Sequence, residues 1–577
     1  MTENAGPVPF RQAAWGDGLR IGNASGFYGD RFDAWQEMLD GGPLDVLTGD
    51  YLAELTMLIL GRDRLKNPET GYAKTFLRQM ERCLGTALER GVKIVSNAGG
   101  LNPSGLAQAL EKLGLNARVG VVLGDDLGTV NGPDDQVLAG IIGQPLTANA
   151  YLGAFGIAEC LAAGADIVVT GRVTDASLVV GPAIARFGWA RDDYDKLAGA
   201  TVAGHLLECG AQATGGNYAF FTELPDHARH PGFPIAEIHA DGRAVITKHP
   251  GTGGAVTTET ITAQLLYEIG NPEYLGPDVV THMDTVVLTQ GGPDRVLVSG
   301  VQGSPPPATL KVGINSLGGY RNSMTFILTG LNIEEKAALV REQIERRVGP
   351  EGLESVLARV DRPDAETEQA ASALLAVHIK DQDPKRAGRT FSQAAVELAL
   401  ASYPGLALTG PPADASPFGV FTAFDLPQEA VTHTALLPDR TTKAIDPPST
   451  EHAPKSPRST QGQPSSAPTR RAPLGHVAGA RSGDKGGDAN VGVWARSDAG
   501  HEWLRGFLTV QRLKTLMPEA ESLDVERFEL PNLRALNFVI HGLLGEGVAA
   551  STRFDPQGKG LGEWLRSRIV DIPVELL

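Results

Sequence analysis

Short apolar runs alternate with amphipathic segments through the first 190 residues of the chain. Runs rich in Val, Ile and Leu end near Gly22, Thr48, Ser96 and Thr170, and each is followed by a polar loop and a helical pattern. Short apolar strands separated by helices are typical of a parallel sheet with both faces covered. The pattern therefore predicts an α/β fold with a parallel-sheet N-terminal domain that extends to about residue 282.

From residue 283 the pattern changes to strands that follow one another directly. Four strands are predicted in succession, at 285–290, 295–301, 309–316 and 322–330. A helix at 333–349, a further strand and a helix near 390–402 come next. This mixture predicts an α+β subdomain over residues 283–438, so that the main domain covers residues 1–438.

A segment without aromatic residues separates this main domain from the end of the chain. Residues 439–473 are rich in Pro, Ser and Thr and cannot bury enough apolar surface to offset their ordering entropy, which predicts a flexible linker. Strands and helices then alternate through residues 474–577, including strands at 474–482 and 490–496 and a helix at 502–516. We expect a small ferredoxin-like α+β C-terminal domain there.

Composition and charge limit the binding partners and the cellular compartment that we expect. The chain has 577 residues with a formal net charge of -17, so we expect neither nucleic acid nor a membrane as partner. Its three cysteines, Cys83, Cys160 and Cys209, show no CxxC pattern, which favours a reducing compartment without a disulfide framework. No leader-like start and no apolar stretch of membrane-spanning length is present, and we expect a cytoplasmic protein.

The first candidate site lies where the predicted parallel strands end, because ligands of α/β proteins gather in the crevice at that edge. Each strand end delivers small or polar residues: Asn97, Gly99 and Gly100 after one strand, and Arg172 and Asp175 after another. Arg172 could bind a carboxylate or phosphate with two hydrogen bonds. Asp175 is either a catalytic group or simply the N-cap of the next helix.

A second candidate is "HLLECG". His205 and Glu208 are three residues apart and share one face of a helix, where they could act as an acid–base pair or as ligands to a divalent metal ion. Cys209 follows directly and is either a nucleophile or a buried structural cysteine. Two candidate ligands do not make a metal site, and we expect none.

Two glycine-rich loops are candidates for binding anions. In "KHPGTGGAVTT", Lys248 precedes Gly251, Gly253 and Gly254 and then a helix that Thr257 or Thr258 would cap, although the loop could be only a tight turn. In "GARSGDKGGDANVGVWARS", a hairpin would bring Arg481, Ser482, Asp484 and Lys485 to one end of the small sheet. Such a loop could bind an anion, dock onto the acidic main domain, or be merely solvated.

Long stretches of this chain resemble one protein family. "SNAGGLNP", "VVTGRVTDASLVVGP", "ECGAQATGGNY", "KHPGTGGAV", "QLLYEIGNPEYLGPDV", "VSGVQGSPPPATLKVGI" and "ARSGDKGGDANVGVWAR" are similar to the acyclic terpene utilisation AtuA family. The resemblance covers the main domain and the ferredoxin-like C-terminal domain. It implies a place in bacterial catabolism of citronellol- and geraniol-type acids as CoA thioesters, and it transfers no catalytic residues.

Two functions are compatible with these residues. The first is an enzyme that acts on an acyl-CoA thioester or branched carboxylate by acid–base chemistry, as a hydratase, lyase, isomerase or acyl transferase. The second is a non-catalytic acyl-CoA-binding or scaffold subunit for partner enzymes. We expect no firm cofactor, a CoA thioester as a candidate substrate, a homo-oligomer, and acyl-CoA-processing enzymes as candidate partners. No dinucleotide-binding fingerprint follows the early strands, which disfavours redox chemistry.

Overall fold

The computed structural model describes residues 18–127, 145–359, 364–450 and 467–577. They form two compact units. The first unit contains Met1–Ile314, Thr422–Leu543 and Gln557–Leu577, and the second contains Asn315–Phe421 and Leu544–Pro556. The large sheet and the C-terminal domain thus belong to the same unit.

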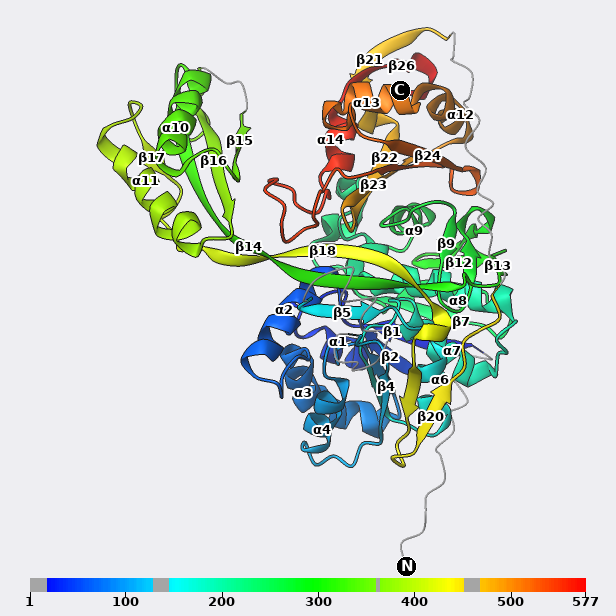
Figure 1. Cartoon of the computed structure of the whole chain (residues 1–577). Coiled ribbons are helices and arrows are strands. Elements are labelled where there is room, and N and C mark those ends of the chain that lie inside the picture. The colour runs from blue at the N-terminus through cyan, green and yellow to red at the C-terminus, as the bar shows by residue number, and fades with distance from the viewer. Residues whose placement is uncertain (1–17, 128–144, 360–363, 451–466) are drawn as a thin grey trace, which may run out of the picture. The chain divides into compact units, whose positions relative to one another are not determined.

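An eleven-stranded sheet is the centre of the first unit (Figure 1). Its order is β11-β12-β8-β7-β1-β2-β3-β6-β4-β19-β20, and the run from β1 to β4 is parallel. The parallel strands are β1 (Leu19–Asn23), β2 (Val46–Gly49), β3 (Lys93–Ser96), β6 (Ile167–Thr170) and β4 (Val119–Leu123). The flanking strands are β7 (Pro234–Ile238), β8 (Ala244–Lys248), β11 (Val287–Gly292), β12 (Arg295–Ser299), β19 (His433–Leu436) and β20 (Thr442–Ile445).

The predicted α/β fold is confirmed, and antiparallel strands extend the predicted parallel sheet on both sides. Strands β7 and β8, and then β11 and β12, pair as hairpins beyond β1, while β19 and β20 do so beyond β4. A hairpin needs only a short turn and no crossover helix, so these strands lack the strand–helix alternation that marks the parallel part.

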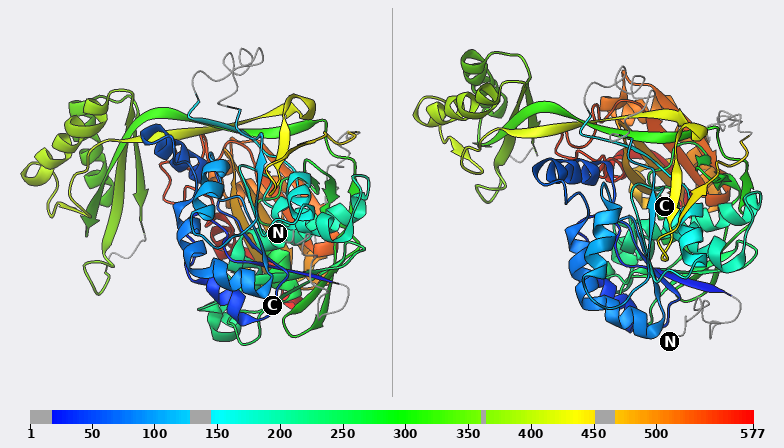
Figure 2. Two further views of the ribbon diagram at one scale, coloured as in Figure 1. Left: turned by 90° about the horizontal axis from the view of Figure 1, so that it is seen from below. Right: turned by 60° about the horizontal axis from the view of Figure 1, so that its bottom comes forward.

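Alternate residues of the parallel strands face two separate cores. Val46, Val95 and Val168 belong to a core shared with α6 (Phe155–Ala162), α7 (Ser177–Phe187) and α8 (Tyr194–Glu208). The neighbouring Leu47 and Ile94 belong to another, shared with α1 (Ala34–Gly41), α3 (Lys74–Arg90) and α4 (Pro103–Glu111). Figure 2 shows these blue and teal helices on either side of the strands. The result is the helix–sheet–helix layering expected of a doubly covered sheet.

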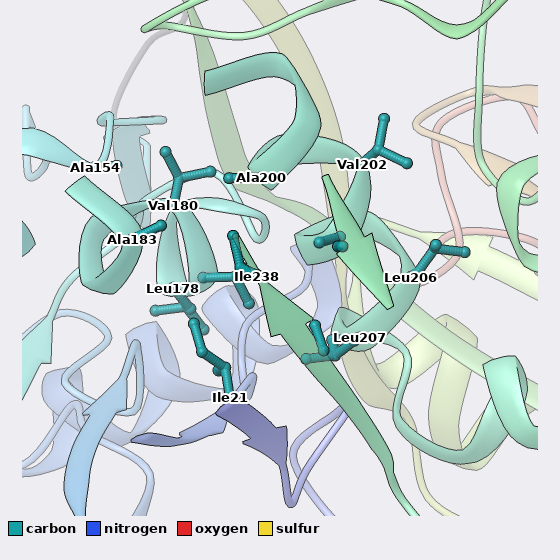
Figure 3. Packing of buried hydrophobic residues seen from close by; sticks show 14 of the residues in the cluster. Ile21, Ala154, Leu178, Val180, Ala183, Ala200, Val202, Leu206, Leu207 and Ile238 are labelled. Atoms are coloured by element: carbon teal, nitrogen blue, oxygen red, sulfur yellow. The ribbon is translucent and has the colours of Figure 1, made fainter. Parts of the chain in front are cut away.

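Helix α8 lies inside the first core and is buried from Leu197 to Glu208. Figure 3 shows its Leu206 and Leu207 in the cluster that includes Ile21 of β1 and Ile238 of β7. A helix that is apolar all round is a buried helix. Its C-terminal end therefore carries His205 and Glu208 into the protein interior at the edge where the parallel strands end.

Close packing of α8 onto the loop before α7 leads to a stability prediction. A Cβ added at Gly204 would lie 2.7 Å from Cα and 2.8 Å from the carbonyl oxygen of Ala176. Gly204→Ala should lower the free energy of unfolding by about 1–3 kcal/mol, because backbone must shift to admit the methyl group. Urea unfolding measures this change.

The matched control is Gly85→Ala in α3, where an added Cβ meets no atom within 4 Å. This substitution should raise stability by about 0.5–1 kcal/mol, since alanine loses less backbone entropy in a helix. Equal effects at the two glycines would contradict the packing described for α8.

The C-terminal domain is a four-stranded antiparallel sheet with three helices. The sheet order is β22-β23-β25-β24, and the strands are β22 (Ala478–Lys485), β23 (Asp488–Ala495), β25 (Ala535–Ile540) and β24 (Val525–Leu530). The helices are α12 (Asp498–Phe507), α13 (Val510–Leu516) and α14 (Leu561–Ser567). The helix predicted at 502–516 is therefore two helices, divided where Thr509 caps α13 through the amide of Arg512.

Ordered strands extend into both ends of the predicted linker. Its first residues include β20, which completes the edge of the large sheet, and its last residues form β21 (Thr469–Pro473), which pairs with β26 (Ile569–Pro573). Hydrogen bonds between the backbones of paired strands hold both ends of this polar segment in place, although its side chains bury little apolar surface. Residues 451–466 lie outside the described residues.

The second unit contains parts of two long strands, β14 (Thr309–Thr329) and β18 (Ser416–Pro427), which pair with each other. Beside β14 lie β15 (Leu353–Ala358), β16 (Ser372–Asp381) and β17 (Ala407–Leu408), and α10 (Ile333–Val348) and α11 (Phe391–Glu397) pack on this sheet. The prediction of separate strands at 309–316 and 322–330 was wrong. The glycines between them do not form a turn; a Cβ at Gly318 would lie 2.4 Å from the Phe418 ring, so close strand packing requires glycine there.

The remaining elements of the first unit are α2 (Glu54–Lys66), α9 (Thr258–Leu265), β5 (Thr147–Ala150), β9 (Glu273–Leu275), β10 (Val280–His282) and β13 (Gln302–Ser304). None of the helices in the described part of the chain has the length and apolar character needed to cross a membrane.

Candidate functional site

The ends of the parallel strands are joined by buried polar side chains. Asn97, after β3, donates to Asp50 Oδ1 at 2.6 Å and accepts the amide of Tyr51 at 2.8 Å. Burial raises the pKa of the Asp50 carboxyl well above its usual value, and the nearby charge of Asp175 raises it further. Asp50 therefore ionises less readily than a carboxyl in water.

Asn23, at the end of β1, fixes the end of α8. Its side-chain amide donates to the carbonyl of Leu207 and, at 3.3 Å, to that of Glu208. The last carbonyls of a helix have no partner within the helix, so this contact satisfies them. The strand edge thereby sets the position of the Glu208 side chain.

Arg172, after β6, is buried and connects several of these loops. Its guanidinium lies 2.9 Å from Asp175, donates to the Leu52 carbonyl at 3.0 Å, and stacks 4.1 Å from the centre of the Tyr151 ring. Its backbone amide donates to Asp125 at 2.7 Å. Charge, hydrogen bonds and ring contact hold the guanidinium at the strand edge.

The interpretation of Asp175 as a helix N-cap was wrong. Residue Ala176 occupies the cap position of α7 and makes no side-chain hydrogen bond, whereas the Asp175 carboxylate is paired with Arg172. The ion pair holds the carboxylate away from the helix amides. Asp175 retains 29% exposure of its side chain.

His205 and Glu208 do contact each other, with Nδ1 and Oε1 3.0 Å apart. Burial lowers the pKa of His205 to about 4, so the imidazole is neutral near pH 7. Burial also raises the pKa of Glu208 well above its usual value, and the charges of Asp175 and Glu268 add to this effect. Within the described residues, Glu208 Oε2 and His205 Nε2 are buried without a hydrogen-bond partner.

Cys209 is placed beside this pair but has unfavourable electrostatics for a nucleophile. Burial raises the pKa of its thiol well above the usual value, and the charge of Glu208 raises it further. It also follows the C-terminus of α8, where the helix dipole disfavours an anion. A neutral thiol is a poor nucleophile.

Lys311 and Glu54 also belong to the cluster, although sequence reasoning missed both. Lys311 lies 3.5 Å from Glu54 and 4.6 Å from the centre of the Tyr151 ring, which Arg172 also contacts. Burial lowers the pKa of Lys311, but the charges of Tyr151 and Glu54 outweigh it and the net shift is upward. Two cations therefore flank one aromatic ring at the strand edge.

The hairpin between β22 and β23 reaches this cluster from the C-terminal domain. Lys485 Nζ donates to the Glu268 carbonyl at 3.1 Å, and the Arg481 guanidinium lies 4.5 Å from the centre of the Tyr267 ring. Burial raises the pKa of Asp484 to about 7, with the charges of Glu268 and Glu54 contributing. Ser482 instead serves the C-terminal domain, where it donates to the Lys559 carbonyl and accepts the Gly562 amide.

The glycines of this hairpin allow the contact. A Cβ at Gly483 would lie 2.5 Å from the Tyr267 ring, and a Cβ at Gly492 would lie 2.6 Å from Leu266 Cβ. The turn itself, Gly486–Gly487, has Gly486 at a φ of 65°, as two-residue hairpin turns require. The unusual composition of "ARSGDKGGDANVGVW" thus reflects both a tight turn and the close approach of the hairpin to residues 266–270.

Water reaches part of this cluster of ionisable groups. Lys485 is exposed, and the side chains of Lys311 and Asp175 retain 41% and 29% of their exposure. A ligand in solution can therefore approach these three side chains.

The Lys248 side chain, at the start of the 248–254 loop, interacts with groups outside this cluster. Lys248 Nζ donates to the Thr252 carbonyl at 2.7 Å and pairs with Asp294 at 3.1 Å, so its charge is balanced within its surroundings. Gly253 and Gly254 pack against the backbone at His230 and Thr214, while an added Cβ at Gly251 meets no atom within 4 Å. As predicted, Thr257 caps the following helix, in a capping box with Thr260.

Gly99 and Gly100 support the strand edge through their backbone. A Cβ at Gly99 would lie 2.4 Å from the Thr170 carbonyl oxygen, and one at Gly100 would lie 2.4 Å from Leu60. Both positions bring the loop after β3 close to its neighbours. Their placement explains why these residues are glycines without requiring that they bind an anion.

Comparison with known protein families shows which family the chain belongs to. The family described as "Acyclic terpene utilisation family protein AtuA" matches residues 19–437, and the AtuA ferredoxin-like domain matches residues 472–571. The chain belongs to the AtuA family. Comparison with curated proteins and with solved structures found no match.

Membership of the AtuA family places the chain in acyclic terpene utilisation and confirms the resemblance seen in its motifs. Residues of the main domain and of the ferredoxin-like domain interact in this cluster: Arg172, Asp175, His205, Glu208 and Cys209 with Arg481, Asp484 and Lys485. Within the described ranges, no group of three or more His, Cys, Asp or Glu side chains is arranged to hold a metal ion.

Proposed function

We propose that this AtuA-family protein is an enzyme that catalyses a non-redox acid–base reaction on a CoA thioester of an acyclic terpenoid or branched acid. The observation that carries the proposal is a cluster in which carboxyls with raised pKa, Glu208 and Asp484, interact with the cations Arg172, Lys311 and Lys485. Ionisable groups with perturbed pKa values that cluster together are typical of catalytic sites.

Each part of the cluster suits a step of such a reaction. Because its pKa is raised, Glu208 holds its proton to a higher pH than an ordinary carboxyl and can act as a general acid. Neutral His205, 3.0 Å away, can orient the carboxyl. The cations can bind a substrate carboxylate, a phosphate or the oxygen on which negative charge develops. Hydration, elimination and double-bond isomerisation all use proton transfer together with a group that stabilises the developing negative charge.

Calorimetric titration with free CoA, acetyl-CoA and citronellyl-CoA tests the proposal. We expect the terpenoid thioester to bind at least tenfold more tightly than free CoA, and Lys485→Met to weaken that binding. Lys248→Met is the matched control, since its ammonium is already paired with Asp294. Product analysis by mass spectrometry would then identify the reaction.

Two outcomes would contradict the proposal. Absence of binding by all three compounds would exclude a CoA thioester as ligand. Tight binding without turnover, unchanged by Glu208→Gln, would instead favour a non-catalytic subunit that presents the thioester to acyl-CoA-processing enzymes.

A further inference from the structure

In the segment that follows α9, Glu268 has an unusual backbone conformation. Glu268 has a φ of 57°, in the left-handed region that usually takes glycine or asparagine after a helix. For other residues this conformation is strained and persists only where the surroundings enforce it. Strain of this kind concentrates at functional sites, so Glu268 needs a specific explanation.

The C-terminal domain enforces this conformation from both sides of the residue. The Asn490 side chain accepts the Glu268 amide at 2.9 Å, and Lys485 Nζ donates to the Glu268 carbonyl at 3.1 Å. Asn490 also donates to the Leu266 carbonyl at 2.8 Å and to Asn537, whose own amide donates to the Ile269 carbonyl at 3.1 Å. The backbone of residues 266–270 is therefore clamped by two fully buried asparagines.

The Glu268 side chain lies against the hairpin of the C-terminal domain, because a Cβ added at Gly483 would lie 3.2 Å from Glu268 Cγ. Its charge raises the pKa of Glu208, another carboxyl of the main domain, and burial raises its own pKa, with Glu54 contributing. Lys485, which makes no ion pair among the described residues, donates its ammonium to the Glu268 carbonyl. Two interacting carboxyls of the main domain thus lie beside a cation from the C-terminal domain.

We infer that Glu268 is a second proton-transferring residue of this site, held in its strained position by Asn490 and Lys485 of the C-terminal domain. The inference rests on the proposed function. Ionised Glu268 takes a proton from the carbon next to the thioester carbonyl, and the C–H electron pair forms an enolate. Protonated Glu208 then returns a proton at the far carbon of the conjugated system, or to a departing hydroxide. One proton leaves the substrate and one is supplied, so no oxidant or reductant is needed.

The first test needs no substrate. Because Glu268→Gly relieves the strain and removes a crowded carboxyl, we expect the Tm of the full chain at pH 8 to rise by about 1–3 °C. Glu268→Gln should leave the Tm unchanged or slightly higher. Arg534→Gly is the matched control, since Arg534 has a φ of 52° in the same unit but pairs with Asp498 rather than with a group of this cluster. A fall of several degrees for both Glu268 variants would identify a structural residue and overturn the inference.

The second test follows deuterium uptake from D₂O into the carbon next to the carbonyl of citronellyl-CoA. We expect Glu268→Gln to slow this exchange at least 100-fold, with Arg534→Gly within threefold of the unchanged protein. Exchange within threefold in Glu268→Gln would refute the role of Glu268 while leaving the proposed function intact. If the unchanged protein exchanges no deuterium with any thioester, the proposed function fails. The Tm measurement then still shows, without any substrate, whether the Glu268 conformation is strained.

Discussion

Glu208→Gln is expected to lower the turnover of the CoA thioester by about 10²–10⁴-fold, the range that a positioned proton donor contributes. The amide keeps the shape of the side chain and its contact with His205, but it cannot release a proton. The stability of the fold should not fall, because a buried carboxyl with a raised pKa destabilises the folded state once it ionises.

The pH dependence of turnover provides a second readout. Since the pKa of Glu208 is raised, the protonated acid is lost only as the pH climbs through that raised value, and activity should decline there. Glu208→Gln should lack this alkaline decline. Steady-state kinetics across the pH range measures both effects.

Glu159→Gln is the matched control for this prediction. Glu159 pairs with Lys443 at 2.7 Å on a partly exposed surface of α6, so its loss should change turnover less than twofold. Equal turnover and the same pH profile in Glu208→Gln and the unchanged protein would remove Glu208 from the reaction.

The sequence predicts the strand edge well because local patterns determine it. Strand ends near Thr48, Ser96 and Thr170 follow from apolar runs that stop at polar loops. In a parallel sheet, the ends of such strands meet by topology. The contact between His205 and Glu208 is likewise local, because residues three apart share a helix face.

Long-range contacts account for what the sequence did not predict. Lys311 joins Arg172 at Tyr151 only because β5 pairs with β14, and no local pattern indicates that pairing. Glu268 could have been suspected, since a glutamate follows α9 where a glycine usually ends a helix. Its clamp by Asn490, however, is set by the docking of a domain more than 200 positions later in the chain.

Two roles that the local pattern left open depend on the same kind of contact. Lys248 beside a glycine-rich loop fits either an anion site or a tight turn, and Asp294, on the β11–β12 hairpin, partly balances its charge. Asp175 is paired with Arg172 and does not cap the next helix. In each case the tertiary structure brings in an opposite charge that the local pattern does not show.

Arg172→Met should destabilise the chain by about 3–5 kcal/mol at pH 8, because it leaves buried carboxyls without the cation that balances them. Methionine fills much of the volume against Tyr151 but cannot pair with Asp175 or donate to the Leu52 carbonyl. Urea unfolding measures the loss. The matched control is Arg82→Met, which breaks an ion pair with Asp33 of similar length on the exposed surface and should cost about 0–1 kcal/mol.

The pH dependence of this loss identifies its cause. Burial raises the folded-state pKa of Asp50, and removing the attraction of Arg172 raises it further. A carboxyl with a raised folded-state pKa binds its proton more tightly in the folded than in the unfolded chain, so stability declines as the pH rises through the window between the two values. The deficit of Arg172→Met should therefore be largest at pH 8 and should shrink toward pH 5.

Asp50→Asn introduced into Arg172→Met should restore part of the lost stability at pH 8, since it removes a buried charge that has lost its counterion. The same substitution in the unchanged chain should give a smaller gain, because Arg172 still balances the carboxylate there. A deficit that is the same at pH 5 and pH 8, without rescue by Asp50→Asn, would mean that Arg172 stabilises the strand edge by packing rather than by charge.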